Sequence, residues 1–309
     1  MTITVLQTNR LLARCEAALA ERFEVLHLPA PAERAAFFAA NGPRIRAIAG
    51  HAADAALMDL MPNLEIIANF GVGYDGIDTQ AARARNIRVT NTPDVLTDAV
   101  AELAVGMMIG LARQIPRADR YVRDGKWQAG SFPFASELNG KTVGIAGLGR
   151  IGKEIAARLT AMRMRVVYFG RREQSLEPYQ FFPDLIEMTR AVDWLVAVMP
   201  GGAETAGLIG RDVLEALGPE GRLLNIGRGT AVDEPVLVEF LQSGRIAGAV
   251  LDVFADEPNV PAELLELDNV LLTPHIASAT AQTRNQMADL LVANLDAHFA
   301  GDVLPSAVA

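Results

Sequence analysis

Short runs of aliphatic and β-branched residues alternate with longer alanine-rich amphipathic stretches along the first ninety residues. The stretches between the aliphatic runs predict helices. The aliphatic runs predict strands over residues 3–6, 25–28, 45–49, 65–68 and 88–90. Strands and helices in strict alternation imply parallel strands joined by crossover helices, so this region is predicted to form an α/β domain.

A long helical pattern over residues 97–123 interrupts this alternation. It is followed by an irregular aromatic segment over residues 127–139, which contains Trp127, Phe132 and Phe134. We expect a homodimer, in which this segment either contacts the second subunit or packs as a surface loop.

The alternation resumes after residue 142, and the final helix, over residues 280–299, is long enough to return to the first domain. The strands predicted in this second region lie over residues 143–147, 165–169, 194–198, 222–226, 247–251 and 270–272. We therefore expect a discontinuous substrate domain of residues 1–97 plus 285–309, with a dinucleotide-binding domain of residues 98–284. Both domains are predicted to be Rossmann-like or flavodoxin-like doubly wound parallel sheets, with the active site in the interdomain cleft.

Composition narrows the picture mainly by exclusion. A chain of 309 residues with 50% hydrophobic and 21% charged residues is typical of two globular domains. The net charge of −9 disfavours nonspecific binding to nucleic acid or to an anionic membrane. The single cysteine, Cys15, cannot form an intrachain disulfide, and no Cys/His cluster has zinc-site spacing, so no metal is expected. Because the chain begins without a signal-peptide pattern and its longest apolar run is too short to span a bilayer, we expect a cytoplasmic protein.

A glycine-rich turn lies between the strand predicted at 143–147 and the helix that follows it. Gly147 permits the tight turn, Gly149 lets the backbone approach a pyrophosphate, and Gly152 lets helix and strand pack closely. The first turn of the helix directs N–H groups and a positive dipole end toward the anion. In this context the motif predicts dinucleotide binding.

The residues after the next strand select the dinucleotide. An NAD site places an acidic residue there, about 20 residues after the glycine motif, to bind the ribose 2′-OH. Here Gly170 occupies the position and is followed by Arg171 and Arg172. A carboxylate would repel a 2′-phosphate, whereas arginine donors can pair with it. The sequence therefore predicts NADPH/NADP+ as the cofactor, with weaker use of NADH.

Three polar residues follow strands of the second predicted sheet. Arg228, Glu257 and His275 each come shortly after a different one of its last three strands. The carboxyl edge of an open parallel sheet is where such proteins bind ligands. Each residue alone could be a surface residue, but their joint placement predicts a catalytic group.

The sequence resembles the D-isomer-specific 2-hydroxyacid dehydrogenase family over nearly its whole length. Besides the glycine turn, the resemblance is carried by residues 69–78 (NFGVGYDGID), 225–229 (NIGRG), 251–254 (LDVF), 257–258 (EP) and 274–275 (PH). Residues 91–97 and 287–290 are most similar to the glyoxylate/hydroxypyruvate reductases, whose members commonly prefer NADPH.

The resemblance implies roles for these side chains. His275 would protonate the carbonyl oxygen during reduction, while Glu257 would hold the other ring nitrogen and favour the charged imidazole. Arg228 would bind the substrate carboxylate and polarise the carbonyl. The backbone N–H groups of Val72 and Gly73 would complete the carboxylate site.

Further contacts are expected around these groups. By the same resemblance, Asp252 would accept a hydrogen bond from the nicotinamide carboxamide and fix the face that transfers hydride. His51 and Phe70 are candidates for the wall of the substrate pocket, with Phe132 or Phe134 of a second subunit. The other residues expected to contact the cofactor are Thr97, Leu148, Arg150, Ile151, Pro200, Thr205 and Ile226.

We therefore expect NADPH-dependent reduction of small 2-ketoacids: glyoxylate to glycolate and hydroxypyruvate to D-glycerate. The same chemistry on 2-ketogluconate or an aryl pyruvate stays open, because sequence does not fix the pocket shape. Gly170 disfavours an NAD-dependent phosphoglycerate dehydrogenase, and Glu257 disfavours the formate dehydrogenase branch, which has glutamine there. An NADP(H)-sensing binding protein without turnover is the alternative from another class, because corepressors share this fold.

Overall fold

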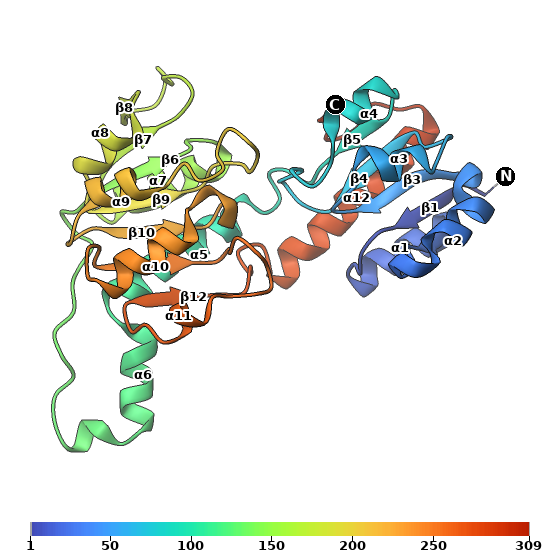
Figure 1. Cartoon of the computed structure of the whole chain (residues 1–309). Helices are drawn as coiled ribbons and strands as arrows, with labels where there is room; N and C mark the ends of the chain where they lie inside the picture. The colour runs from blue at the N-terminus through green and yellow to red at the C-terminus, as the bar shows by residue number, and fades with distance from the viewer. Residues whose placement is uncertain (1, 309) are drawn as a thin grey trace. The chain divides into compact units, whose positions relative to one another are not determined.

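The computed structural model describes residues 2–308 and divides them into two α/β units (Figure 1). The first unit contains the residues up to Leu96 and those from Ala279 onward, and Thr97–Ser278 form the second. The second division falls before the expected residue 285, because a single unbroken helix over Ala281–Ala300 begins just after it and packs against elements of the first unit.

The first unit is built on a five-stranded parallel sheet. Its strand order is β2 (Glu24–His27), β1 (Thr4–Gln7), β3 (Ile45–Gly50), β4 (Ile66–Asn69) and β5 (Arg88–Thr90). On one side of the sheet, α1 (Ala13–Arg22) packs against α12 (Ala281–Ala300). The core on the other side includes side chains from α2 (Arg34–Asn41), α3 (Ala55–Asp59) and α4 (Thr79–Ala84). The short 3₁₀ turns η1 (Pro31–Glu33) and η2 (Gly42–Arg44) flank α2. All five predicted strands are present, with their ends within one residue of prediction.

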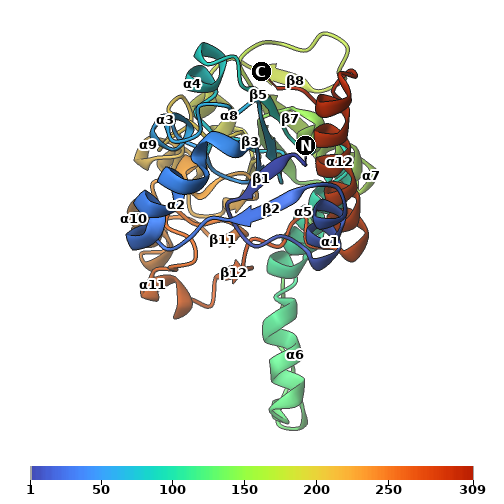
Figure 2. The ribbon, with the colours of Figure 1, turned by 90° about the vertical axis from the view of Figure 1, so that its right-hand side faces the viewer.

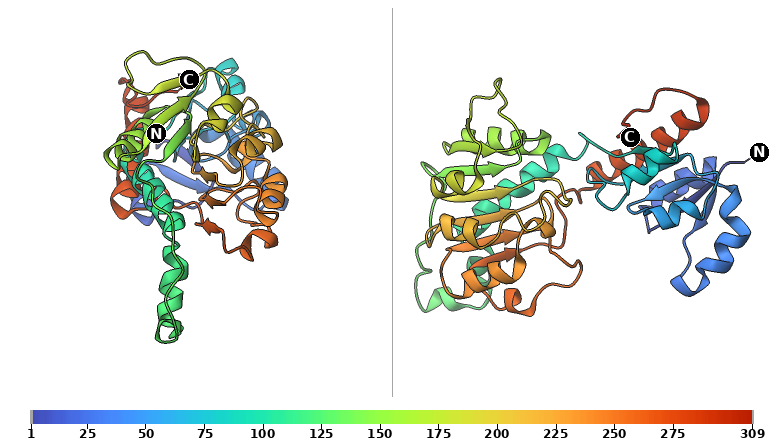
Figure 3. Two further views of the ribbon diagram at one scale, coloured as in Figure 1. Left: turned by 90° about the vertical axis from the view of Figure 1, so that its left-hand side faces the viewer. Right: turned by 45° about the horizontal axis from the view of Figure 1, so that its top comes forward.

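The second unit contains a seven-stranded parallel sheet. Its strand order is β12 (Val270–Leu272), β11 (Gly248–Leu251), β10 (Arg222–Asn225), β9 (Trp194–Ala197), β6 (Thr142–Ala146), β7 (Arg165–Phe169) and β8 (Gln180–Phe182). Helices α5 (Thr97–Ala112) and α7 (Arg150–Ala161) pack together on one face (Figure 3). The other face carries α8 (Leu185–Arg190), α9 (Arg211–Leu217) and α10 (Glu234–Gln242), and the connections include η4 (Gly229–Ala231) and α11 (Ala262–Leu265). The doubly wound fold class is thus confirmed, although β8 was not predicted.

The prediction of one long helix over residues 97–123 was wrong in one respect, because this stretch forms two helices. After α5, Gln114 adopts a left-handed conformation with φ of 52°, and α6 (Ile115–Arg123) continues at a bend of 59°. Pro116 lacks the N–H that would continue the hydrogen-bond ladder, so one helix cannot run through this point with all of its backbone hydrogen bonds. Helix α6 and η3 (Lys126–Gln128) extend away from the seven-stranded sheet as an arm (Figure 2).

None of the helices within residues 2–308 is by itself long and apolar enough to cross a membrane, whereas α5 and α6 taken as a bent pair meet that test of length and composition.

Candidate active site

The carboxyl ends of the strands in the second sheet stand in one transverse row. The residues paired side by side along this row are Phe169, Ala146, Ala197, Asn225, Leu251 and Leu272. The glycine turn, the arginine pair, Arg228, Asp252 and His275 each follow a member of this row by one to three residues. The register therefore brings the chemically active residues of this unit to one edge of the sheet.

Each of the three glycines in the turn lacks a side chain for a different structural reason. Gly147 has φ of +104°, and a Cβ there would lie 3.1 Å from Met199. A Cβ on Gly152 would lie 2.2 Å from the carbonyl oxygen of Gly147, so α7 could not approach β6 as closely. A Cβ on Gly149 would meet no atom of residues 2–308 within 4 Å, which leaves open space beside the backbone. Gly149 is also the N-cap of α7 and provides no side-chain cap, so this turn fits a dinucleotide pyrophosphate.

The adenosine end of the expected dinucleotide site follows β7. Arg171 and Arg172 are exposed. A Cβ on Gly170 would meet no described atom within 4 Å. Packing would therefore admit an aspartate at Gly170, and the lack of an acid matters for its charge rather than its size. The residues present fit a 2′-phosphate better than an unmodified ribose.

The other residues expected to contact the cofactor lie on this same unit. In the loop after β9, the Thr205 hydroxyl donates to the Pro200 carbonyl at 2.8 Å. Ile226 is buried directly after β10. The remaining positions are Leu148, buried in the glycine turn, Arg150 and Ile151 at the start of α7, and Thr97 at the start of α5, which packs on α7.

His275 and Glu257 form a direct pair, with 2.7 Å between His275 Nδ1 and Glu257 Oε2. The other carboxylate oxygen, Oε1, accepts the Phe254 N–H at 3.1 Å. The backbone of His275 is left-handed, with φ of 51°, and its N–H donates to the carbonyls of Asp252 at 2.8 Å and Thr273 at 3.1 Å. When Nδ1–H donates to Glu257, Nε2 is the nitrogen that can exchange a proton with a bound molecule.

Asp252 is fully buried, and its carboxylate is committed to the loop that carries His275. Its Oδ1 accepts the Thr273 hydroxyl at 2.7 Å and the Ile276 N–H at 2.8 Å, and its Oδ2 accepts the Ala277 N–H at 2.9 Å. The family resemblance implied a bond from the nicotinamide carboxamide to Asp252. Because no atom of Asp252 reaches the surface, such a bond would require this loop to move.

Arg228 lies half-buried after β10, in a turn that is held by Asn225. The Asn225 side chain donates to the Arg228 carbonyl at 2.9 Å and accepts the Gly227 N–H at 3.2 Å. The guanidinium of Arg228 donates to the Gly227 carbonyl at 2.9 Å. Sequence reasoning did not identify Asn225, although a polar residue at the last position of a buried strand is a usable signal.

In the first unit, two buried asparagines hold the loop of residues 71–74, here called the 71–74 loop. Asn69 Nδ2 donates to the carbonyls of Gly71 and Gly73, both at 2.9 Å, and Asn91 Nδ2 donates to the Val72 carbonyl at 2.9 Å. Across a trans peptide, the carbonyl of one residue and the N–H of the next point in opposite directions. The N–H groups of residues 72–74 therefore point away from the asparagines, as a carboxylate site requires.

Two aromatic rings and one arginine lie at the same edge of the first unit. His51 is exposed after β3, and its backbone N–H donates to Asn9 at 3.0 Å. Phe70 is buried, and the centroid of its ring lies 5.9 Å from that of the His51 ring. The Arg284 guanidinium also lies 5.9 Å from the Phe70 ring centroid. The Phe70 ring therefore contacts both of these groups at this edge of the first unit. Burial lowers the pKa of the Arg284 guanidinium. Sequence reasoning missed Arg284, which reaches this edge only because α12 folds back onto the first sheet.

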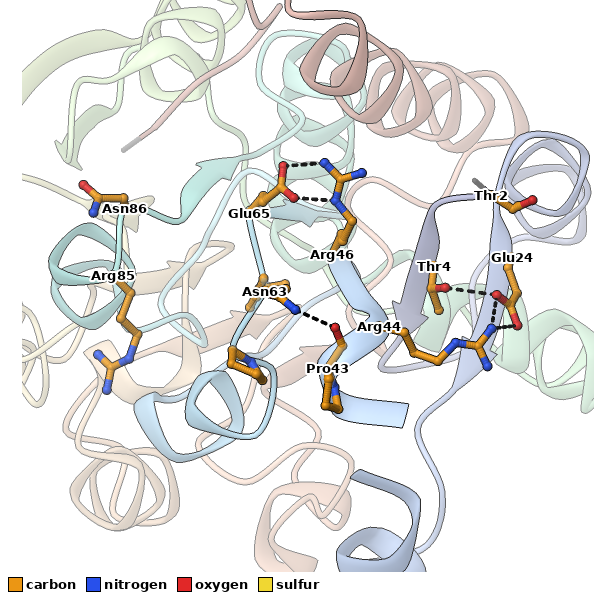
Figure 4. Close-up of a pocket in the computed structure, with 12 residues that line it drawn as sticks. Thr2, Thr4, Glu24, Pro43, Arg44, Arg46, Asn63, Glu65, Arg85 and Asn86 are labelled. Atoms are coloured by element: carbon orange, nitrogen blue, oxygen red, sulfur yellow. Dashed lines mark hydrogen bonds and ion pairs between the residues drawn. The ribbon is translucent and has the colours of Figure 1, made fainter. Parts of the chain in front are cut away.

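A cavity of about 860 Å³ lies at the opposite, amino-terminal edge of the first sheet (Figure 4). Its three arginines are already paired, Arg44 with Glu24, Arg46 with Glu65 and Arg85 with Asp59. The hydrogen bond from Arg46 lowers the pKa of the Glu65 carboxyl. Ligands of open parallel sheets bind at the carboxyl edge, so we assign no site to this cavity.

Comparisons with known proteins agree with this geometry. The family described as D-isomer specific 2-hydroxyacid dehydrogenase, NAD binding domain, matches residues 105–277. A glyoxylate/hydroxypyruvate reductase A of Arabidopsis thaliana is 44% identical over 306 residues, covering 98% of each chain. A hydroxyphenylpyruvate reductase of Plectranthus scutellarioides is 46% identical, covering 94% of this chain and 93% of its own. The solved structure of an NADPH-dependent glyoxylate/hydroxypyruvate reductase from Sinorhizobium meliloti, in complex with NADP and malonate, is 45% identical with a TM-score of 0.96, covering 100% of this chain and 97% of its own.

Proposed function

The chain belongs to the D-isomer-specific 2-hydroxyacid dehydrogenase family, and on that premise we propose that it is an NADPH-dependent reductase of small 2-ketoacids. Its substrates are glyoxylate, which becomes glycolate, and hydroxypyruvate, which becomes D-glycerate. The observation that carries the proposal is the His275–Glu257 pair on the same sheet edge as a dinucleotide turn. Relatives with these substrates in their names support the choice of ketoacid.

The chain's own residues divide the work of the reaction. NADPH supplies the hydride when it is bound. His275 Nε2 gives a proton to the carbonyl oxygen of the ketoacid, and Glu257 at Nδ1 stabilises the charged imidazole before that transfer. Arg228 pairs with the substrate carboxylate and polarises the neighbouring carbonyl. In the first unit, the N–H groups of Val72 and Gly73 donate to a substrate carboxylate, with Arg284 adding positive charge at the same edge of that unit.

One observation favours the same chemistry on a larger, apolar ketoacid. A cavity of about 240 Å³ adjoins the His275–Glu257 pair, and apolar side chains from Phe254, Val260 and Leu272 contribute to its lining. An aryl substituent on the ketoacid would bury apolar surface there. The hydroxyphenylpyruvate reductase among the relatives points in the same direction.

Initial rates with glyoxylate, hydroxypyruvate, 2-ketogluconate and phenylpyruvate, each with NADPH and with NADH, test the proposal. We expect steady NADPH oxidation with hydroxypyruvate and glyoxylate, and slower rates with NADH. A higher kcat/KM with phenylpyruvate would favour the larger-ketoacid alternative. Tight NADPH binding without turnover of any ketoacid would indicate a sensor and refute the reductase.

We also propose that the protein is a homodimer, and that the second copy contacts the arm of α6 and η3 together with the irregular segment that follows it, up to residue 139. Ile115, Val122, Trp127 and Phe134 place large apolar side chains on this arm, each with at least half of its surface exposed. Covering such a surface with a second copy would stabilise the dimer. Sedimentation equilibrium should give twice the 33.1 kDa chain mass. The unpaired thiol of Cys15 supports a reducing, cytoplasmic location.

A further inference from the structure

The loop that connects β7 to β8 carries the two arginines expected to bind the 2′-phosphate. Residues 170–179 form no helix or strand, and Arg171 and Arg172 lie near the start of this loop. A loop without regular structure loses conformational entropy when a ligand orders it, and that loss subtracts from affinity. Contacts that hold such a loop before binding therefore increase affinity for the ligand.

Gln174 holds this loop at two points. Its backbone N–H donates to the hydroxyl of Tyr168 at 2.7 Å, and Tyr168 is fully buried in β7. Its side-chain Nε2 donates to the carbonyl of Leu148 at 2.7 Å. Leu148 lies between two glycines of the dinucleotide turn. Gln174 thus connects the loop of the arginines to the turn that fits the pyrophosphate.

An ion pair adds a third attachment three residues later. Lys153, in the first turns of α7, lies 2.8 Å from the carboxylate of Glu177. The Glu177 N–H also donates to the Gln174 carbonyl at 3.0 Å, so the two attachments share one turn. Because both ends of this ion pair retain some solvent contact, we expect it to contribute less than the Gln174 hydrogen bonds.

These attachments leave few residues free to move on either side of the arginines. Phe169 is fixed in β7, where its carbonyl accepts the Gly147 N–H at 3.0 Å. Only residues 170–173 lie between Phe169 and Gln174. Moreover, the Leu148 carbonyl points toward Gln174, so the N–H of Gly149 points the opposite way. One side chain therefore orients both a pyrophosphate donor and the arginine loop.

We propose that Gln174 is a positioning residue for NADP(H) selectivity, an inference that rests on the proposed function. Gln174 holds Arg171 and Arg172 in place relative to the glycine turn, so the 2′-phosphate site exists before the cofactor binds. Five strand intervals of roughly 4.8 Å separate β7 from β12, which places this loop roughly 24 Å from the strand that precedes His275. Changes at Gln174 should therefore alter cofactor selectivity without touching the proton donor.

Isothermal titration with adenosine 2′,5′-bisphosphate and 5′-AMP tests this role, because the two ligands differ only in the 2′-phosphate. Gln174→Met keeps the side-chain length and removes the amide donor. We expect the preference for the bisphosphate to fall about three- to tenfold, the effect of one lost hydrogen bond. Tyr168→Phe, which removes the acceptor for the Gln174 N–H, should shift the preference in the same direction. Gln180→Ala is the matched control, since Gln180 accepts from Arg165 at 2.8 Å on the exposed side of β8.

The outcomes separate this inference from the proposed function. If the wild type binds both ligands equally, the NADP(H) preference itself is wrong. If the wild type prefers the bisphosphate and both Gln174→Met and Tyr168→Phe retain that preference within twofold, only the positioning role is overturned. An equal loss in Gln180→Ala would also overturn it, because the effect would then reflect general loosening of the β7–β8 connection. Unchanged melting temperatures with a reduced preference support the role.

Discussion

Replacing Asn69 by alanine should weaken binding of the ketoacid while leaving the dinucleotide site unchanged. The substitution removes the donor to the Gly71 and Gly73 carbonyls, so the 71–74 loop loses two hydrogen bonds. At about 0.5–1.5 kcal/mol net for each bond, the loop loses about 1–3 kcal/mol of stabilisation. If all of this energy serves to orient the carboxylate donors, KM for the ketoacid rises by about 5- to 150-fold.

The kinetic pattern distinguishes this role from damage to catalysis. The substrate carboxylate is bound equally in the ground state and the transition state, so KM should rise while kcat changes little. Steady-state NADPH oxidation with hydroxypyruvate gives both constants, and titration of NADPH into each variant checks the cofactor site. Asn91→Ala, which frees the Val72 carbonyl, should give the same pattern.

The matched control is Asn63→Ala. Asn63 is an exposed asparagine at the opposite edge of the same unit, where it donates to the Pro43 carbonyl at 2.7 Å. Its removal should leave KM unchanged. A folded Asn69→Ala protein with wild-type KM, or an equal rise in Asn63→Ala, would show that the buried asparagine does not organise the carboxylate site.

Four further predictions test the other assignments. His275→Ala should lower kcat by about 10²- to 10⁴-fold through loss of proton transfer, and wild-type NADPH oxidation in this variant would remove His275 from the mechanism. Arg171→Ala combined with Arg172→Ala should raise KM for NADPH far more than KM for NADH, and equal changes would show that neither arginine reads the 2′-phosphate. Gly170→Asp should reverse the preference toward NADH, because the open space there admits the side chain and its charge repels the phosphate; an unchanged ratio of kcat/KM values would contradict this. Burial raises the pKa of the Cys15 thiol to about 11, so at pH 8 about one thiol in a thousand is the reactive thiolate; a disulfide reagent monitored by absorbance should react with it only after unfolding in urea, and rapid reaction of the native protein would refute its burial.

Most strands could be predicted because each is a short aliphatic run bounded by turn residues. Strand β7 was predicted with the observed ends, since its buried Val-Val-Tyr core contrasts with the polar loop that follows. Strand β8 was missed because it is not an aliphatic run: it begins with an exposed glutamine, and the two phenylalanines that follow are only partly buried. The break before α6 could have been inferred from Pro116, but the helical pattern on both sides of it obscured that signal.

In the candidate site, features formed by residues close in sequence could be predicted, whereas contacts between distant elements could not. The glycine turn was predictable because its three glycines lie at a recognisable spacing within one continuous strand–turn–helix segment. Asn91, Gln174 and Arg284 were not, because each acts on residues whose position depends on another element. The Gln174–Leu148 contact, for example, joins the loop after β7 to the turn after β6, and only the pairing of those strands brings the two together.

Asp252 shows why the direction of backbone groups limits what sequence can reveal. The family resemblance implied that Asp252 is a cofactor ligand, and two of its three hydrogen-bond donors are the N–H groups of Ile276 and Ala277. Those groups point at Asp252 in a loop where His275 is left-handed, a conformation uncommon for residues other than glycine. A buried carboxylate is costly unless it is fully hydrogen-bonded, so the carboxylate and the unusual His275 backbone stabilise each other. The proposed proton donor, His275, is therefore positioned from two sides, by Glu257 through its ring and by Asp252 through the loop that carries it.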